Sequence, residues 1–264
     1  MIYRQLSQEE FADLQTRIIY EDNHLFIFNK RPGEIVQGDK TGDEPLSETL
    51  KAFIALRDSK PGQVFMGVPH RLDRPVSGIV VFAKTSKALE RLAEMFRNGD
   101  FHKTYLALCC NKPGQPEGTL EDWIVRNEKQ NKSYVAASVT PETAGAQPED
   151  MPLPKKVAGR RAGVSTNIPS GAKLARLKYR WLQDTDNYHL LEVELLTGRH
   201  HQIRCQLAQI GCVIKGDLKY GAPRSNPDGG ICLHSYRATF VHPVRKEELT
   251  LTAPVPSSWK GVNI

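Results

Sequence analysis

The sequence has few cysteines, no long apolar run and no leader-like start. Its 264 residues include five cysteines, an odd number, and no two of them form a CxxC pair. A disulfide framework is therefore not expected, and a reducing cytoplasm is the expected compartment. The first residues lack the charged-then-apolar pattern of a secretory leader, and runs such as 78–83 are far shorter than the roughly 20 residues that cross a bilayer. We expect no membrane association.

Common ligand-binding signatures are also missing. The chain contains neither GxGxxG nor GxxxxGK[ST], which excludes the usual nucleotide-binding loops. The adjacent His200 and His201 have no Cys or carboxylate at metal-ligand spacing, so no metal is expected. With 39% hydrophobic and 25% charged residues, the composition is that of a globular chain and excludes disorder or a fibre.

Positive charge is concentrated in one segment. The net charge is +6, yet residues 151–180 contain many Lys and Arg and no Asp or Glu, so the rest of the chain is slightly acidic. Clustered cations favour a polyanionic partner such as a nucleic acid, because binding releases counterions from its phosphates. The same stretch is rich in Pro, Gly, Ala and Ser, and a solvated loop explains it equally well.

Apolar periodicity predicts an α+β fold. Helices are expected at 7–15 and 46–56, through 89–96 with an end at Asn98-Gly99, and at 201–209; strands are expected at 17–20, 25–28, 66–68, 78–83, 102–108, 133–138, 174–182, 188–196, 232–240 and 248–252. Strands outnumber possible crossover helices, which indicates a mixed, largely antiparallel central sheet with flanking helices. Residues 140–171 lack a period and are predicted to be an inserted loop.

One carboxylate stands in an unusual local sequence. Asp73 lies between Arg71 and Arg74, just before a small-residue turn and an apolar strand. Nearby cations hold a carboxylate ionised, and an ionised carboxylate in an enclosed site suits a nucleophile or a proton acceptor. The alternative is a surface aspartate in a salt-bridged loop, and the local sequence leaves both readings open.

Two further segments combine cations with polar or aromatic groups. Gly198 is expected to open a helix whose first turn carries Arg199 and His200, with Arg204 one turn beyond His200. The unpaired N–H groups at the start of that helix, together with the Arg and His side chains, would receive an anion. Tyr105 follows Lys103 by two residues in an expected strand, so ring and cation share a face on which a base can stack. An ordinary strand tyrosine explains that pattern too.

Taken in order, five motifs resemble the RluA family of RNA pseudouridine synthases: HRLDRPVSG, HKTYLAL, LLTGRHHQIR, GDLKYG and CLHSY. The likeness extends over about 18–254, and the segment NKRPG is similar to the family's early NKPxG, with Arg31 where Pro is usual. Three other positions depart from the family pattern: Val76 replaces Thr, Gln206 replaces His and Ser235 replaces Ala.

The resemblance implies a pseudouridine synthase fold with a catalytic cleft, and isomerisation of specific uridines in structured RNA, either large-subunit rRNA or tRNA, without a cofactor or metal. It implies that Asp73 is the catalytic carboxylate, that Tyr105 stacks on the base and that Arg204 pairs with the carboxylate. A carboxylate assists glycosidic cleavage either by bonding to the anomeric carbon or by removing the 2′ proton, and both routes stay open.

Binding of structured RNA requires that the target base be flipped out of its stack, at a cost of a few kcal/mol. The resemblance implies that Arg71 fills the vacated space and that Leu233 lines the pocket. Three more cations are candidates for RNA contact: Arg74, Lys103 and Arg199.

The expected organisation is an N-terminal extension, 1–17, followed by one catalytic domain, 18–264, in which the basic insertion grips phosphates or acts as a spacer. A monomer is sufficient for this arrangement. The main alternative is a non-catalytic RNA-binding or ribosome-assembly protein on the same scaffold. A glycoside hydrolase is a further option, but it needs a second carboxylate that no motif supplies clearly.

Overall fold

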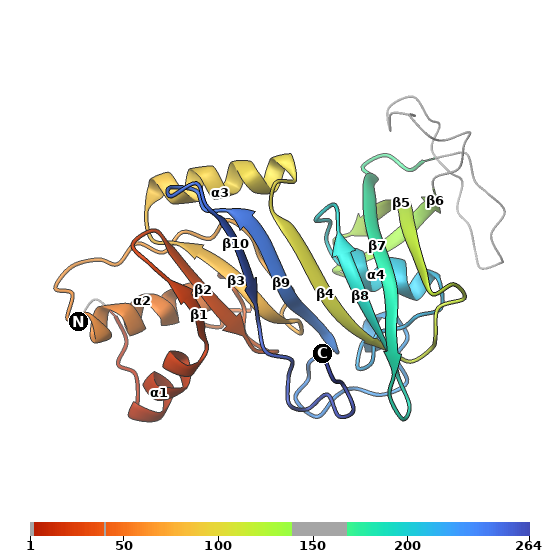
Figure 1. The fold of residues 1–264 in the computed structure, drawn as a ribbon, viewed down its shortest axis with the longest axis horizontal. Coiled ribbons are helices and arrows are strands. Elements are labelled where there is room, and N and C mark those ends of the chain that lie inside the picture. The colour runs from red at the N-terminus through yellow and green to blue at the C-terminus, as the bar shows by residue number, and fades with distance from the viewer. Residues whose placement is uncertain (1–2, 40, 139–167) are drawn as a thin grey trace. The chain divides into compact units, whose positions relative to one another are not determined.

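The computed structural model describes all residues except 1–2, 40 and 139–167 (Figure 1). The chain forms two compact units, which are described one at a time. Unit 1 comprises Met1–Leu106 and Asn226–Trp259, and unit 2 comprises Ala107–Ser225 and Lys260–Ile264. None of the helices in the described parts of the chain combines the length and hydropathy that a bilayer crossing requires.

Unit 1 contains a mixed sheet and three helices. The strands are β1 (Ile18–Glu21), β2 (Leu25–Lys30), β3 (Ser77–Ala83), β9 (Leu233–Val241), β10 (Glu248–Thr252) and the first residues of β4 (His102–Cys109); the helices are α1 (Gln8–Thr16), α2 (Leu46–Arg57) and α3 (Ser86–Asn98). The strand order is β1-β2-β3-β9-β4, with β10 on β9. The β1/β2, β2/β3 and β9/β10 pairs are antiparallel, and β3/β9 is parallel.

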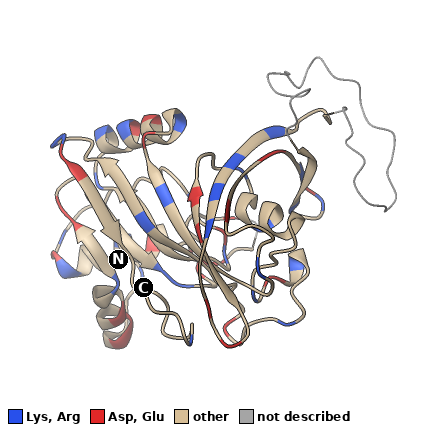
Figure 2. Cartoon of the chain, turned by 45° about the vertical axis from the view of Figure 1, so that its right-hand side comes forward, with Lys and Arg blue, Asp and Glu red and all other residues tan. Residues whose placement is uncertain are grey.

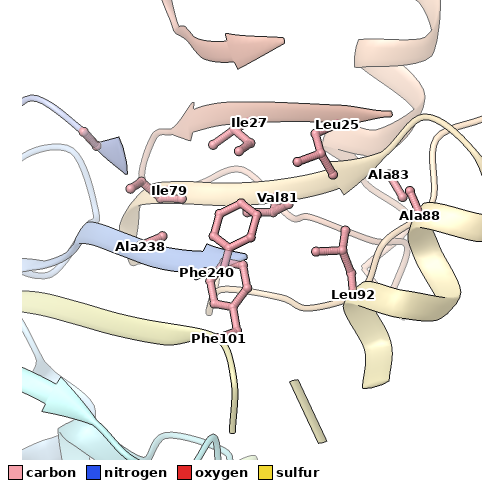
Figure 3. Packing of buried hydrophobic residues seen from close by; sticks show 11 residues of the cluster. Leu25, Ile27, Ile79, Val81, Ala83, Ala88, Leu92, Phe101, Ala238 and Phe240 are labelled. Carbon is pink, nitrogen blue, oxygen red and sulfur yellow. The ribbon is translucent and has the colours of Figure 1, made fainter. Parts of the chain in front are cut away.

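The core of unit 1 forms where α3 packs on the sheet (Figure 3). Alternate residues of β2, Leu25 and Ile27, point toward the α3 side, where Leu92 is fully buried. The ring of Phe101, just before β4, stacks on Phe240 of β9 with centroids 4.5 Å apart. α3 begins at an N-cap threonine and ends at a glycine with φ 85°, so local sequence fixes both ends of the helix.

Unit 2 contains a four-stranded antiparallel region with one buried helix. Its strands are β5 (Glu117–Asn127), β6 (Lys132–Ser138), β7 (Lys173–Asp184) and β8 (His189–Leu195), in the order β8-β7-β5-β6. Helix α4 (Gln202–Gln209) contacts β5 and β6, and the short 3₁₀ helix η2 (Leu218–Tyr220) contacts α4. Six consecutive residues of α4 are buried, including polar ones, so their side chains need partners inside the unit.

The predicted α+β class with a mostly antiparallel sheet is confirmed, and the elements differ from the prediction at three points. No strand forms at 66–68, where Gly67 makes only an isolated bridge to Ala83. β5 was missed, because its acidic residues lower strand propensity. The helix predicted at 201–209 forms as α4, but Gly198 does not open it, since His201 takes a left-handed φ of 52° as the N-cap. Most of the predicted insertion, 140–167, lies outside the described residues.

Candidate active site

Asp73 lies at the start of the turn that leads into β3 in unit 1, and it is partly buried. The Asp73 carbonyl accepts a hydrogen bond from the Val76 N–H at 3.0 Å, which closes a four-residue turn. The Pro75 carbonyl, in the same turn, accepts a hydrogen bond from the Ile231 N–H at 3.0 Å. The backbone that carries the carboxylate is therefore tied both to itself and to the segment before β9.

The buried side chain of Lys30 is hydrogen-bonded to the same turn. Its ammonium donates to the carbonyls of Arg31 at 2.9 Å, Arg74 at 3.0 Å and Val76 at 2.7 Å. The side chain is fully buried, and burial lowers the pKa of Lys30 to about 8, while the charges of Glu34 and Asp73 oppose this shift. A buried ammonium that satisfies three carbonyls fixes the position of the Asp73 turn.

The parallel pairing of β3 with β9 brings a third segment close to this turn. Gly78 has φ 106°, and a Cβ at this position would lie 2.3 Å from the Ser235 carbonyl oxygen, so no other residue fits. The Ser77 hydroxyl is hydrogen-bonded to Nδ1 of His234 at 2.8 Å, and both side chains are buried. Leu233 directly precedes this contact and is 3% exposed; its role as a pocket residue stays a prediction.

Tyr105 on β4 is the aromatic member of the unit 1 group and is 6% exposed. Burial raises its pKa far above the ordinary value, a hydrogen bond with Ser235 lowers it, and the negative charge of Asp73 raises it further. The phenol is thus protonated at neutral pH. The electrostatic influence of Asp73 on Tyr105 places the two predicted catalytic side chains of unit 1 in one neighbourhood.

The three predicted cations of unit 1 differ in their surroundings. Arg71 is exposed, and within the described chain its guanidinium has no hydrogen-bond or ion-pair partner. Arg74 pairs with Asp43 at 2.6 Å, with both side chains about half exposed. Lys103 is partly buried with its ammonium 5.3 Å from the Phe96 ring centroid, and burial lowers the pKa of Lys103 to about 8. Arg71 is the least constrained of the three.

In unit 2, Arg204 forms a buried, bidentate ion pair with Asp217. Nε lies 2.7 Å from Oδ2 and Nη2 lies 2.8 Å from Oδ1 of the carboxylate, and both side chains are less than 6% exposed. The Tyr220 ring lies 5.1 Å from the Arg204 guanidinium carbon. This geometry orients the guanidinium before any ligand binds. The pairing of Arg204 with Asp73, which belongs to the other unit, stays a prediction.

Comparison with known proteins decides the family. The family model described as RNA pseudouridylate synthase matches residues 24–209 of this chain. The chain belongs to this family. Ribosomal large subunit pseudouridine synthase D of Xylella fastidiosa is 30% identical over 92% of the chain and 67% of its own length. tRNA pseudouridine synthase C of Vibrio parahaemolyticus is 29% identical over 94% of both chains.

A solved structure supports the fold of this pseudouridine synthase. The structure of human RNA pseudouridylate synthase domain containing 4 superimposes on this chain with a TM-score of 0.72 at 22% sequence identity. The superposition covers 94% of this chain and 92% of the human chain. Because the sequence identity is low, this similarity concerns the fold alone. The family is one of enzymes that act on RNA, and nothing found favours the non-catalytic alternative considered from the sequence.

Two residues that depart from the family pattern have defined contacts in the synthase. Ser235 is hydrogen-bonded to Tyr105, as described above. Gln206 is fully buried in α4, and its Nε2 donates to Asp122 Oδ2 at 2.6 Å, while Ser138 donates to Asp122 Oδ1 at 2.7 Å. At the position where the family pattern has His, Gln206 thus supplies a donor to a buried carboxylate.

Near the start of α4, donors of Arg199 that were predicted to receive an anion are bonded within the protein. The Arg199 N–H donates to Oε1 of Gln202 at 3.0 Å, so it is bound within the protein. The exposed Arg199 side chain donates from Nε to the Leu174 carbonyl at 2.9 Å. Among the described residues there is also no cluster of three His, Cys, Asp or Glu side chains arranged to hold a metal.

The basic segment of the synthase is only half within the described residues; Lys155, Lys156, Arg160 and Arg161 lie outside them. The other half lies on β7, where Lys and Arg alternate with apolar residues (Figure 2). Three of these cations face carboxylates on neighbouring strands: Arg176 with Glu121, Lys178 with Glu194 and Arg180 with Glu192. The described half is therefore largely neutralised by cross-strand pairs.

Sequence reasoning assigned no role to two side chains that shape the site. Lys30 was noticed only within NKRPG, and Asp217 only within GDLKYG. Their buried contacts join residues distant in sequence, and no local pattern reveals them. The motif strings were the available signal, because both residues lie in segments that resemble the family.

We expect Lys30→Met to lower the free energy of unfolding by about 2 kcal/mol, because it leaves buried carbonyls without a donor while removing a buried charge. Urea unfolding followed by circular dichroism measures the change. Lys51→Met, which removes an exposed pair with Glu48, is the control and should change stability by about 0.5 kcal/mol or less. Equal stability of the Lys30 variant and the wild type would show that the ammonium does not hold the turn.

Proposed function

We propose that this chain isomerises specific uridines in rRNA or tRNA, with Asp73 as the catalytic carboxylate and Tyr105 as the ring that receives the flipped base. The observations that carry the proposal are the tightly bonded turn that holds Asp73 and the effect of its negative charge on the pKa of the buried Tyr105. A fixed carboxylate next to an aromatic ring suits a reaction that holds a planar base while its bond to the sugar breaks.

The reaction changes only the point of attachment of the base. The bond between N1 of uracil and C1′ of the ribose breaks, the base rotates, and C5 bonds to C1′. The hydrogen on C5 is then released to solvent, and N1 takes up a proton. Asp73 serves either by bonding to C1′ or by removing the 2′ proton, and both routes need the ionised carboxylate.

The proposal gives the cations separate roles. Arg204, oriented by Asp217, is the counterion of the catalytic carboxylate. Arg71, with its unbound guanidinium, enters the space that the flipped base leaves in the RNA. Arg74, Lys103 and Arg199 contact phosphates; the exposed pair of Arg74 with Asp43 is weak enough for a phosphate to replace it.

The substrate class follows from the relatives' names, which refer to the large ribosomal subunit and to tRNA.

We propose an N-terminal extension at 1–17 and a catalytic domain at 18–264, acting as a monomer in the cytoplasm. The five cysteines, all within the described residues, form no disulfide and four of them are buried, which fits a reducing compartment.

We expect the protein to release tritium from bulk RNA that is labelled at uracil C5 and prepared from cells lacking the chain, since base isomerisation expels that hydrogen. Carbodiimide-based primer extension on RNA from cells with and without the chain then identifies the position. A stop that depends on the chain and on Asp73 confirms the assignment. If neither rRNA nor tRNA releases tritium, the proposed substrate class is wrong.

A further inference from the structure

An aromatic and basic surface on unit 2 is not used by the proposed chemistry. It lies at the turn and outer edge of β6, the outermost described strand of its sheet. We define the β6 edge patch by four residues: Arg126, Lys132, Tyr134 and Lys219. Tyr134 is 39% exposed, although it is a large aromatic residue; Arg126 and Lys219 are exposed, and Lys132 is partly exposed. Aromatic rings beside cations are typical of surfaces that bind single-stranded nucleic acid.

Contacts within the β6 edge patch hold its groups in place. The Lys132 ammonium lies 5.1 Å from the Tyr134 ring centroid and 4.9 Å from that of Tyr220. The Tyr134 hydroxyl contacts Oε1 of Gln130, so both ends of the ring are constrained. A ring that is already ordered loses little conformational entropy when a base stacks on it.

The two remaining cations converge on Asn131 in the hairpin turn. Lys219 Nζ donates to the Asn131 carbonyl at 3.0 Å, and Arg126 Nη2 donates to its Oδ1 at 3.3 Å. The positive charges of both cations also help to lower the pKa of His201 to about 2, after burial and together with the charges of Arg204 and His200. Arg126, Lys219 and His201 thus share one positive region.

The cations of the β6 edge patch lack counterions in the described structure. No carboxylate there lies within ion-pair distance of Arg126, Lys132 or Lys219, and Glu128 in the hairpin turn pairs with none of them. The cations of β7 in the same unit face glutamates, as described above. Uncompensated cations repel one another, and an anionic ligand relieves that repulsion. The patch is therefore suited to phosphate groups, and the β7 face is not.

At Ser133 the outward-facing main-chain groups of β6 are already bonded, which argues against strand addition by a peptide at this residue. The Tyr220 hydroxyl accepts from the Ser133 N–H at 2.9 Å and donates to the Ser133 carbonyl at 3.0 Å. Tyr220 also contacts the guanidinium of Arg204, so the patch adjoins the buried Arg204–Asp217 pair within unit 2. A ligand on the patch would lie close to a predicted catalytic residue.

We propose that the β6 edge patch binds a single-stranded segment of the RNA substrate, with phosphates at Arg126, Lys132 and Lys219 and a base stacked on Tyr134. This inference rests on the proposed function and extends it to the nucleotides that flank the target. Phosphate contacts supply affinity that depends on salt, and the ring supplies stacking that tolerates any base.

The test measures binding of a labelled oligouridylate of about 12 nucleotides to the full chain over a range of salt concentrations. We expect Tyr134→Ala to weaken binding about 5- to 100-fold. We expect Lys132→Ala to reduce the magnitude of the slope of log affinity against log salt by about 0.7. On bulk RNA, both variants should raise KM and leave kcat within about 2-fold of wild type, because the patch touches no reacting atom.

Two matched controls separate RNA contact from folding. Tyr134→Phe keeps the ring and loses only the hydroxyl contact with Gln130, so it should bind much more tightly than Tyr134→Ala. Lys178→Ala removes a paired cation of β7 and should leave the salt slope unchanged. If Tyr134→Ala and Lys132→Ala bind the oligouridylate with wild-type affinity and slope, the patch does not bind RNA. That result leaves the proposed function intact, whereas a wild type that forms no pseudouridine overturns the proposed function itself.

Discussion

Asp73→Asn should abolish pseudouridine formation while RNA binding and stability stay close to wild type. The amide has nearly the same shape as the carboxylate, so the turn closed by Val76 and fastened by Lys30 should be retained. The neutral amide neither bonds to the anomeric carbon nor accepts the 2′ proton, so both routes are blocked. We expect the rate to fall by about 10⁴-fold or more, as for other essential nucleophiles and bases. Tritium release under single-turnover conditions measures the effect.

A suitable control for this variant is Asp43→Asn, which removes an exposed carboxylate that pairs with Arg74 in the same unit. It should keep the rate within about 3-fold of wild type, since an exposed ion pair contributes little. Substantial turnover by Asp73→Asn would remove Asp73 from the reaction. Loss of RNA binding in that variant would instead show that the carboxylate acts in binding.

Asp217→Leu is expected to destabilise the protein by about 3 to 5 kcal/mol, because it leaves the Arg204 guanidinium buried without its bidentate partner. Arg204→Leu should have a similar effect for the converse reason, and it should also abolish turnover. The double variant Arg204→Leu/Asp217→Leu removes both buried charges, so we expect it to recover much of the lost stability. Urea unfolding of the wild type, the two single variants and the double variant gives the coupling energy.

Activity of the double variant distinguishes a structural role of Arg204 from a catalytic one. If Arg204 acts in the reaction, the double variant stays inactive although its stability is restored. Turnover that returns with stability would limit the pair to a structural role. Wild-type stability in either single variant would contradict the buried ion pair itself.

The sequence predicts much of this fold because most elements have clear apolar periods. The strand over 78–83 and the helix ending at Asn98-Gly99 were found in this way, and both have local signals at their boundaries. β5 escaped detection because only a short stretch near Trp123 is buried and the buried set includes a carboxylate, that of Asp122. Periodicity reports burial, so a strand with little buried apolar surface gives a weak signal.

The site is predicted less completely than the fold. The motifs located Asp73 and Tyr105, and the structure places both in unit 1. They did not reveal that Lys30 holds carbonyls 44 and 46 residues further along the chain. Such contacts depend on which segments meet in three dimensions. No local arrangement of residues encodes them.

The crossing of Gly78 over Ser235 restricts how this part of the protein can diversify. A Cβ at position 78 would meet three main-chain atoms of residue 235 within 2.8 Å, whereas at Gly67 the three nearest atoms all belong to the flexible Leu89 side chain. Exchanging a side chain for a smaller one removes a collision with that side chain, but no substitution removes a main-chain atom. A second substitution can therefore relieve the clash of a mutant at position 67, but no second substitution can relieve that of a mutant at position 78. Sequence change around the Asp73 turn must therefore take place at residues other than Gly78.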